Sequence, residues 1–524
     1  MLANDQLFKT KESFSFRVRL CDSPDFAPLT IVIYDWFTRE GTPPRAGNKA
    51  EVLVDGAQTW AYAYKDIKAA KRDIRIATWL CRPDIELVRP KSHGVSEPTE
   101  RSHYRFGKLL EDKANLGVKA RVLIWGMTYT PVLNKWLRRW HWTPDDRIEI
   151  MEQDHPLLIG SYHQKTMTID GQIGYCGGMN IKENDWDTND HPVFDPRRNP
   201  HRTKKAFRRL VRDKKKHTKF LPRHDLTIRF EGPVVRDLSL NFIERWNQCV
   251  CSHRTTIRGR IWIWIRKLLG HEPAERLLSD PEPQIPAAPA GEQLAQIART
   301  TPCGEEGILD LYRRAIGNAR RYIYIENQYF RSTTLAKELK NACIKNPELR
   351  LIAVVWPIKD GKKSFFDPSS YWTARTQDII REGRPDFKLT RLLSVDRCAC
   401  GSVQYITVDM HAKVLIVDDE WLTLGSANIN KRGFKYEAEI NAAILDKKTA
   451  RDLRIRLMAE HLKIPAHEAE SKLGDIDAAF KIWEDHCTAN EKARKNGQVA
   501  ASNIHHFDQK AFKFWRYLVH EGVF

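Results

Sequence analysis

Long apolar runs are missing from this chain of 524 residues. A membrane-spanning helix needs about 18 or more consecutive, predominantly apolar residues, and no segment of the sequence approaches that length. The first residues also lack the basic-then-apolar layout of a secretory signal. We therefore predict neither a transmembrane helix nor a cleavable signal peptide, and we expect a soluble protein.

Cysteine is scarce and scattered, with ten residues of this type in the chain. In the two closest pairs, Cys249 with Cys251 and Cys398 with Cys400, one residue separates the members, which is not the spacing of a zinc site. No other spacing along the chain indicates a metal site, so we predict that no metal ion is bound. We interpret the cysteines as mostly reduced thiols; disulfides are the alternative for a protein that works outside the cytoplasm.

The chain does contain one short pattern twice, about half a chain apart. Both copies read H-x-K-x4-D-x6-G-[GS]-x-N. A single His-x-Lys pair would carry no information in a chain with 18 histidines and 86 lysines and arginines, whereas the recurrence of every fixed position at identical spacing predicts a duplicated site. The fixed positions are His163, Lys165, Asp170, Gly177, Gly178 and Asn180 in the first copy, and His411, Lys413, Asp418, Gly425, Ser426 and Asn428 in the second.

These residue types suit the chemistry of a phosphate ester. Residues two apart on a strand point to the same face, so two such strands together would gather two imidazoles and two ammonium groups. The ammonium groups suit a phosphate, and Asn180, Ser426 and Asn428 can hold its remaining oxygens. One imidazole can attack phosphorus while the other protonates the leaving oxygen, without a metal ion. A lone histidine is usually an ordinary core or surface residue, but two complete copies favour a catalytic site.

The doubled pattern resembles the HKD motif of the phospholipase D superfamily. Three further blocks are similar to segments of this family, and two of them, at 224–247 and 323–330, resemble the phospholipases D proper rather than the nucleases; the third resembles the family's N-terminal strand and loop. The resemblance covers roughly residues 45–250 and 300–465. The blocks are Trp79–Asp84, His224–Asn247 with its terminal Glu-Arg-Trp-Asn, and Ile323–Phe330 with its Glu-Asn-Gln-Tyr-Phe.

The resemblance implies a role for each histidine and lysine of the motifs. His163 would be the nucleophile that forms a phosphohistidine. His411 would protonate the leaving alcohol and then deprotonate water. Lys165 and Lys413 would bind the phosphate and the charge that develops on it.

Carboxylates that support the histidines are assigned by the same resemblance. Glu439 follows His411 where the family commonly places a carboxylate that orients the catalytic imidazole, with Glu437 as its alternative. Asp187 occupies a position similar to that of the acidic residue in the first half. Asp170 and Asp418 belong to the catalytic motifs, but we expect them to brace the turn after each strand rather than touch substrate.

The repeat also extends to the predicted secondary structure. Apolar strands at 74–76 and 122–125 match strands at 323–325 and 352–356, and each half then ends in a helical pattern, at 238–246 and 453–462. We therefore predict an α/β fold of two similar lobes, each a mixed sheet flanked by helices, related by pseudo-twofold symmetry. The first lobe is predicted over 1–279, a proline-rich linker over 280–299, and the second lobe with a helical tail over 300–524.

The net charge of +19 has two interpretations. Much of it lies in the basic segment 197–219, which is either a solvated insertion or a surface for anionic phosphates of lipids or nucleic acids. Trp262 and Trp264, flanked by cations, would suit a bilayer interface or a buried segment between the lobes.

The resemblance implies a phospholipase D that hydrolyses glycerophospholipids to phosphatidic acid and a free head group. The alternatives are a phosphatidyltransferase similar to cardiolipin synthases and a nucleic-acid phosphodiesterase. We expect no cofactor, calcium stimulation through the lipid surface, a phospholipid membrane surface as partner rather than nucleic acid, and a peripheral location at membranes. The chain shows no PX, PH or C2 module, and in this respect it resembles bacterial enzymes of the family. These include lipase effectors exported as toxins by type VI secretion, for which a secretion-system component or immunity protein would be a further partner.

Overall fold

The computed structural model describes residues 8–9, 13–19, 26–32, 36–90, 97, 99–126, 148–157, 160–198, 221–255, 277–278, 288–357, 368–397, 401–512, 514–518 and 520–523. Most of the basic segment, together with Trp262 and Trp264 and residues 280–287 of the predicted linker, lies outside these ranges. At the described start of the basic segment both arginines pair with acidic side chains: Arg197 with Asp195 at 2.6 Å and Arg198 with Asp187 at 2.9 Å.

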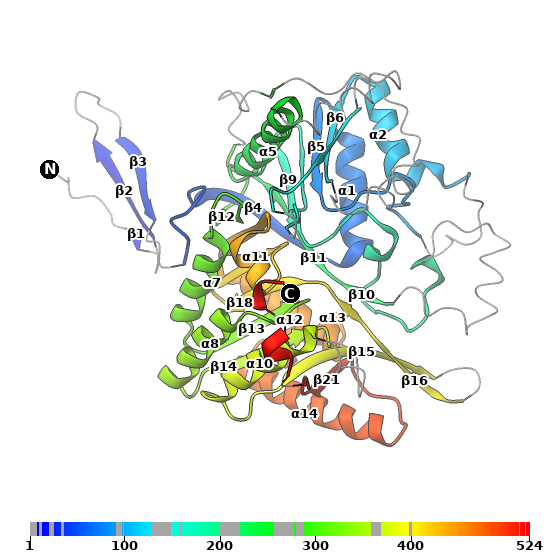
Figure 1. Cartoon of the computed structure of the whole chain (residues 1–524), viewed down its shortest axis with the longest axis vertical. Coiled ribbons are helices and arrows are strands. Elements are labelled where there is room, and N and C mark those ends of the chain that lie inside the picture. Colours follow the sequence, from blue (N-terminus) through cyan, green and yellow to red (C-terminus); the bar gives the residue numbers. More distant parts are fainter. Residues whose placement is uncertain are drawn as a thin grey trace.

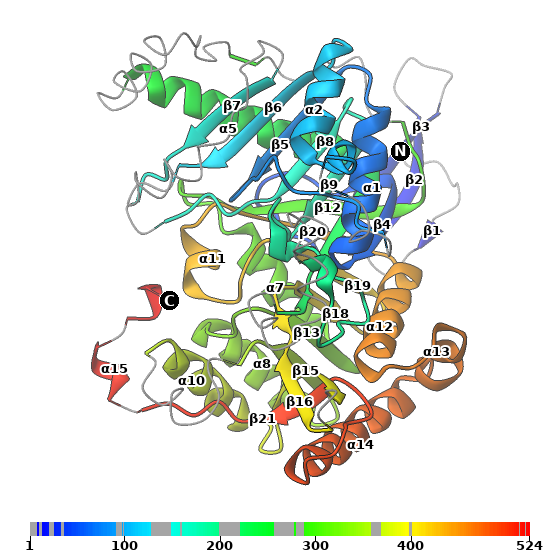
Figure 2. The same ribbon diagram turned by 90° about the vertical axis from the view of Figure 1, so that its right-hand side faces the viewer.

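Sixteen strands form one mixed sheet through the described part of the chain (Figures 1 and 2). At its centre, β4 (Arg45–Val54) pairs antiparallel with β12 (Gln293–Thr300). Outward from β4, the first half contains β11 (Leu226–Glu231), β9 (Ile173–Gly177), β8 (Thr166–Ile169), β5 (Asp73–Thr78), β6 (Lys119–Trp125) and β7 (Ile148–Gln153). Outward from β12, the second half contains β20 (Glu439–Leu445), β19 (Trp421–Gly425), β18 (Lys413–Val417), β13 (Tyr322–Asn327), β14 (Arg350–Val355) and β15 (Leu389–Arg397), and β15 also pairs with β16 (Val403–Thr407) and β21 (Ile504–Phe507).

The two halves repeat the same order of parallel and antiparallel pairs. In each, three parallel strands form the outer part, β5–β6–β7 in the first half and β13–β14–β15 in the second. The inner strands of both halves are antiparallel. The predicted α/β class, with mixed sheets flanked by helices, is therefore confirmed, while a twofold axis relating the halves stays a prediction.

Strand β12 corrects the predicted linker. Residues 293–299 were expected to connect two lobes, but they belong to a strand that is hydrogen-bonded to β20 on one side and to β4 on the other. The run of buried residues from Ala295 to Ala298 explains the assignment, because a strand inside a sheet that is covered on both faces buries side chains on both sides. The halves therefore share a continuous sheet.

Helices cover both faces of the sheet because its strands are apolar on both sides. In β13, Tyr322 and Tyr324 pack on one side and Ile323 and Ile325 on the other, as the two-residue period of a strand requires. In the first half, α1 (Asp55–Ala69) and α2 (Phe106–Asn115) lie on one face and α5 (Val235–Thr255) on the other. In the second half, α7 (Gly307–Asn318), α8 (Thr333–Lys345) and α10 (Ser369–Arg381) lie opposite α12 (Lys447–Leu462), α13 (Ala466–Leu473) and α14 (Ile476–Lys495).

A small antiparallel sheet precedes the main body. Its strands are β1 (Phe8–Lys9), β2 (Ser13–Arg19) and β3 (Phe26–Val32), and Figure 1 draws them apart from the large sheet. None of the helices in the described residues has both the length and the apolar character required to traverse a bilayer.

Candidate functional site

Each repeated motif leads directly into a buried inner strand. Strand β8 follows Lys165, and β18 begins at Lys413. The ammonium group of each lysine turns back to the histidine of its own motif: Lys165 Nζ donates to the carbonyl oxygen of His163 at 2.5 Å, and Lys413 Nζ donates to that of His411. The two lysines are only 4% and 1% exposed, so both positive charges are held inside the protein.

The motif aspartates close the turn after each strand. Asp170 and Asp418 have φ angles of 54° and 57°, in the left-handed region that aspartate tolerates better than most residues. Each carboxylate accepts three backbone N–H groups at the start of the neighbouring antiparallel strand, at 2.7–3.0 Å around Asp170 and 2.7–2.8 Å around Asp418. These hydrogen bonds brace the turns, and neither carboxylate contacts a motif histidine among the described residues.

The backbone of each motif histidine is anchored to the opposite half. The backbone N–H of His163 donates to the carbonyl oxygen of Ala438 at 2.8 Å, and that of His411 donates to the carbonyl oxygen of His224 at 2.8 Å. In both cases the accepting residue directly precedes a buried carboxylate. Two strands from different halves therefore bring each imidazole to a carboxylate that its own half does not supply.

Each imidazole is paired with that carboxylate through Nδ1. His163 Nδ1 lies 2.9 Å and 3.1 Å from the two oxygens of Glu439, and His411 Nδ1 lies 2.6 Å from Asp225 Oδ2. Because Nδ1 is engaged, Nε2 is the ring nitrogen that each histidine can offer to a substrate. A carboxylate in this position fixes the tautomer of the imidazole and stabilises its protonated form.

The structure separates the predicted carboxylates. Glu439 pairs with a catalytic imidazole as predicted, and that imidazole is His163. Glu437 accepts from Ser161 Oγ at 2.9 Å and pairs with Arg432, and Asp187 accepts from Arg198 and lies 3.0 Å from His191 Nδ1. Neither of these two contacts a motif histidine among the described residues.

Asp225 was missed because its distance along the chain from the first motif differs from that of Glu439 in the second. It immediately precedes β11, which pairs with β9, while Glu439 begins β20, which pairs with β19. The basic segment 197–219 lies between the first motif and Asp225 and conceals the match. Comparing the halves strand by strand, instead of counting from the histidine, would have identified it.

Ser426 and Gly178 differ because their carboxylate neighbours differ. Ser426 Oγ donates to Glu439 and lies 3.3 Å from the carbonyl oxygen of Ile440, so its hydroxyl orients the carboxylate instead of facing open space for a phosphate. A Cβ at Gly178 would lie 2.2 Å from Asp225 Oδ1. The absence of a side chain at position 178 is therefore a steric requirement of Asp225.

The two motif asparagines keep a free acceptor. Asn180 Oδ1 and Asn428 Oδ1 are buried and have no hydrogen-bond partner among the described residues. The Asn180 backbone N–H donates to Asp185 Oδ2 at 2.6 Å, which fixes the turn. An unsatisfied buried amide oxygen in both motifs is consistent with a ligand donor that is still to be bound.

The blocks outside the motifs support the site from both halves. Gln328 lies 3.4 Å from Lys413 Nζ, and Asn327 Oδ1 accepts the backbone N–H of Ile429 at 3.0 Å. In the first half, Asn241 and Arg245 on α5 both donate to Gln164 Oε1, between the motif histidine and lysine, at 2.9 Å and 3.2 Å. The sequence marked these blocks without assigning their side chains a role.

Burial sets the electrostatics of the site. Burial, followed by the charge of Lys165, holds the pKa of His163 well below its usual value, and burial, followed by Arg223, does the same for the pKa of His411. Burial lowers the pKa of Lys413 to about 8. It raises the pKa of Asp225 to about 7 and that of Glu439 to about 8. An anion that entered the site would favour the protonated forms of the lysines and imidazoles.

Models of known protein families match segments of both halves of the chain, and these segments include both motifs. A family model described as "Cardiolipin synthase, PLD-like domain" matches residues 64–194 and 312–459, more than half of the chain, and one described as "Phospholipase D" matches residues 145–260. Phospholipase D A of Dictyostelium discoideum is 26% identical, with 85% of this chain and 36% of the relative covered. Phospholipase D alpha 4 of Arabidopsis thaliana is 24% identical, with 80% of this chain and 64% of the relative covered.

A solved structure adds a distant comparison. The phosphatidylserine synthase of Haemophilus influenzae Rd KW20 aligns with a TM-score of 0.47 at 14% identity, covering 86% of this chain and 95% of that one. The chain spans about a third of the length of the first curated relative and less than two thirds of the second. Sheet and motifs define an α/β protein with a doubled histidine–lysine centre. The matched family model then places it: the chain belongs to the phospholipase D superfamily.

Replacing Asp225 by asparagine tests the pair with His411. The amide cannot stabilise an imidazolium and favours the wrong tautomer, so we expect turnover of a soluble phosphodiester to fall by about 10⁴-fold, as a carboxylate-to-amide change beside a catalytic histidine can do. Asp237→Asn is the matched control, because Asp237 is also buried but pairs with Arg45 away from the site. An Asp225→Asn variant with turnover close to that of the control would contradict the assignment.

Gly178→Ala should disturb the same carboxylate sterically. Because a displacement of about 1 Å at a reacting group can cost about 10²-fold in rate, we expect a loss of that order in turnover. Gly317→Ala is the control: this helical glycine of α7 has no neighbouring atom within 4 Å of an added Cβ, so the change should leave turnover unaltered. Equal turnover in the two variants would show that Asp225 can move without consequence.

The pH dependence of kcat/KM should report Lys413. Its charge is present below its pKa of about 8 and is lost as the pH rises through that value, so kcat/KM for an anionic phosphodiester should fall above about pH 8. Lys413→Arg keeps the charge at high pH and should move the alkaline limb upward, with a lower maximum because a guanidinium differs in shape from an ammonium group. Superimposable profiles of wild type and variant would assign the limb to another group.

Proposed function

We propose that the protein is a phospholipase D, which hydrolyses glycerophospholipids to phosphatidic acid and a free head group at a membrane surface. The observation that carries the proposal is the pair of imidazoles, each with Nδ1 held by a buried carboxylate from the other half, beside two buried ammonium groups. Relatives named phospholipase D support a lipid substrate.

The first half-reaction transfers the phosphatidyl group to the protein. His163, with Nδ1–H donated to Glu439, attacks phosphorus through Nε2. The bond between phosphorus and the head-group oxygen breaks, and His411 gives its Nε2 proton to that oxygen. Lys165 and Lys413 bind the phosphate oxygens and stabilise the negative charge that develops on them.

The second half-reaction returns the protein to its starting state. Neutral His411 accepts a proton from water as the water oxygen attacks phosphorus. The bond between phosphorus and His163 Nε2 breaks, phosphatidic acid leaves, and Asp225 stabilises the imidazolium that His411 has become. No proton or electron pair is left over, because each imidazole ends in the state in which it began.

A transferase is the second candidate, because an alcohol can replace water in this step. The description of the matched family model as a cardiolipin synthase, PLD-like domain, favours it specifically. Hydrolysis and transfer share the phosphohistidine and differ only in the acceptor. A single assay with both acceptors present therefore separates them.

We expect mixed phospholipid vesicles to yield phosphatidic acid, and in the presence of ethanol also phosphatidylethanol, detected by mass spectrometry. His163→Ala and His411→Ala should each reduce the rate by at least about 10³-fold, within the range of general acid–base catalysis. His467→Ala is the control, because its side chain is 81% exposed and distant from the motifs in sequence.

The assignment of His163 as nucleophile and His411 as acid is tested in the His411→Ala variant. Without the residue that activates water, the adduct should accumulate on His163 and be visible as a phosphatidyl modification of that residue. An adduct on His411 in the His163→Ala variant, together with no adduct on His163 in the His411→Ala variant, would reverse the assignment. Cleavage of plasmid DNA without any lipid product would refute the lipase proposal as a whole.

A further inference from the structure

A second group of buried titratable side chains lies next to the site, and the proposed reaction does not use it. Two of its histidines and two of its carboxylates converge from four separate segments of the chain. Each carboxylate or ring nitrogen lies within 4.8 Å of the others. The four residues are Asp55 at the start of α1, His191 in the loop after 183–185, His224 in the short strand β10 (Arg223–His224), and Glu460 near the end of α12.

The separations of the four side chains match those of ligands around one small ion. His191 Nε2 lies 3.4 Å from Asp55 Oδ2 and 3.2 Å from Glu460 Oε1. His224 Nδ1 lies 3.1 Å from Asp55 Oδ1 and 3.0 Å from the same Glu460 oxygen. Nitrogen and oxygen ligands at about 2.0–2.2 Å from a tetrahedral zinc ion lie about 3.3–3.6 Å apart, so only small adjustments would admit the ion.

Two of these atoms face other members of the cluster. Asp55 Oδ2 and His224 Nδ1 are buried, and their polar neighbours among the described residues belong to the same four side chains: His191 Nε2 lies 3.4 Å from Asp55 Oδ2, and the Asp55 and Glu460 oxygens lie 3.1 Å and 3.0 Å from His224 Nδ1. A ring nitrogen that faces two carboxylate oxygens at nearly equal distances has the position of a ligand toward an ion shared with them.

The outer nitrogen of each histidine is held by a further carboxylate. His191 Nδ1 lies 3.0 Å from Asp187 Oδ2, and His224 Nε2 lies 3.0 Å from Glu326 Oε2. Metal-binding histidines almost always donate their other ring N–H to such a group, which fixes the tautomer and aims the remaining nitrogen at the ion. Arg198 Nε forms an ion pair with Asp187 Oδ1 at 2.9 Å, and His461 Nε2 lies 2.7 Å from Glu326 Oε1.

We infer that Asp55, His191, His224 and Glu460 form a binding site for a divalent transition-metal ion of the zinc class. The mixed nitrogen and oxygen ligand set disfavours calcium, which takes six to eight oxygens. Four protein ligands would close the coordination sphere, as in structural sites, so the ion would hold the protein together rather than touch substrate. The prediction of no metal site rested on spacing along the chain, and the fold assembles these ligands from segments far apart in sequence.

The site would join the two halves beside the catalytic pair. Three ligands come from the first half and Glu460 from the second. His224 directly precedes Asp225, and the Asp55 backbone N–H donates to the Asp225 carbonyl oxygen at 2.8 Å. An ion at this point would therefore fix the backbone that presents the carboxylate of His411.

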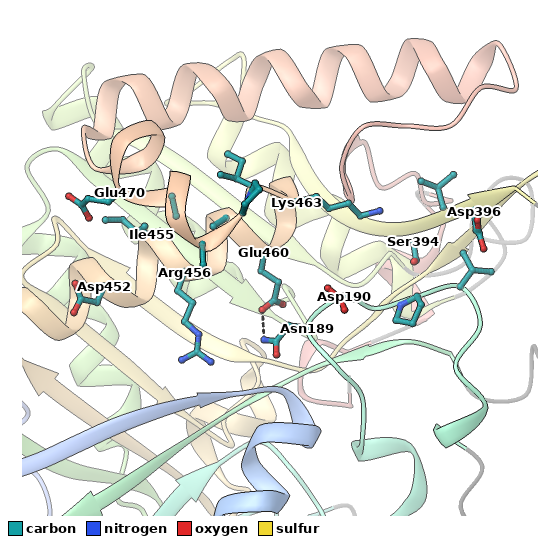
Figure 3. Close-up of a pocket in the computed structure, with 18 residues that line it drawn as sticks. Asn189, Asp190, Ser394, Asp396, Asp452, Ile455, Arg456, Glu460, Lys463 and Glu470 are labelled. Carbon is teal, nitrogen blue, oxygen red and sulfur yellow. Dashed lines mark hydrogen bonds between the residues drawn. The ribbon is translucent and has the colours of Figure 1, made fainter. Parts of the chain in front are cut away.

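A solvent-facing cleft borders the cluster at Glu460. It has a volume of about 890 Å³, lies between α12, β15 and the loop 189–193, and has Glu460 in its wall (Figure 3). Figure 3 also shows Asn189 bonded to Glu460, at 2.7 Å from Oε2, which leaves Oε1 for the cluster. The glutamate thus belongs both to the wall of the cleft and to the cluster.

The test is metal binding by the full chain, read without any activity assay. Protein produced in zinc-supplemented medium and passed through gel filtration should retain about one zinc ion per chain by elemental analysis. Replacement by Co²⁺ should give the strong visible absorption of a tetrahedral site, and added Ca²⁺ should displace neither ion. His191→Asn and Glu460→Gln should lose the ion and lower the midpoint of thermal unfolding.

His505→Asn is the matched control, because His505 is a buried histidine paired with Glu491 at 3.2 Å outside the cluster, and this variant should keep the ion. His163→Ala should also keep it, which separates this inference from the proposed lipase activity. Wild-type protein with no retained zinc and no cobalt spectrum would overturn the proposal and leave the cluster as an ion-pair network of imidazoliums and carboxylates. Retention of the ion by both His191→Asn and Glu460→Gln would overturn it equally, even if other variants failed to fold.

Discussion

The exchange of carboxylates between the halves is the interaction on which the site depends. Two imidazoles and two ammonium groups are held in the interior, where an unpaired charge is costly. Glu439 and Asp225 offset part of this cost, because their charges oppose the burial that lowers the pKa of Lys165 and Lys413, and each also pairs with a histidine of the opposite half. Removing one partner of a buried charged pair commonly costs about 3–5 kcal/mol. The same interactions therefore stabilise both the site and the contact between the halves.

The sheet explains how this exchange is positioned. The β4–β12 pair joins the halves in one continuous hydrogen-bonded structure, and the backbone bonds from His163 to Ala438 and from His411 to His224 set the register of the crossing. In each crossing the residue after the backbone acceptor carries the carboxylate. Glu439 therefore lies beside the imidazole of His163, and Asp225 beside that of His411. Little freedom remains for either ring, which is the condition for two groups that must act on one phosphate ester.

Sequence reasoning found what is local and missed what is brought together by folding. The strands at 74–76 and 323–325 follow from apolar residues in a short run, and the motif residues follow from repeated spacing. Asp225 has no fixed distance from His163 because a basic insertion intervenes. Glu439 was predicted to orient a catalytic imidazole, but the sequence could not show that this imidazole is His163 of the opposite half. The cluster of Asp55, His191, His224 and Glu460 could not be predicted either, because folding brings together three distant segments of the first half and α12 of the second.

The difference between Gly178 and Ser426 bears on how such a protein can evolve. An ancestor with one motif would have needed two copies, and symmetry would have forced both histidines into identical surroundings. In a single fused chain each position can drift separately: here one carboxylate is long and held by a hydroxyl, while the other is short and fits only against a glycine. Fusion thus allows the surroundings of two chemically equal imidazoles to diverge independently of each other.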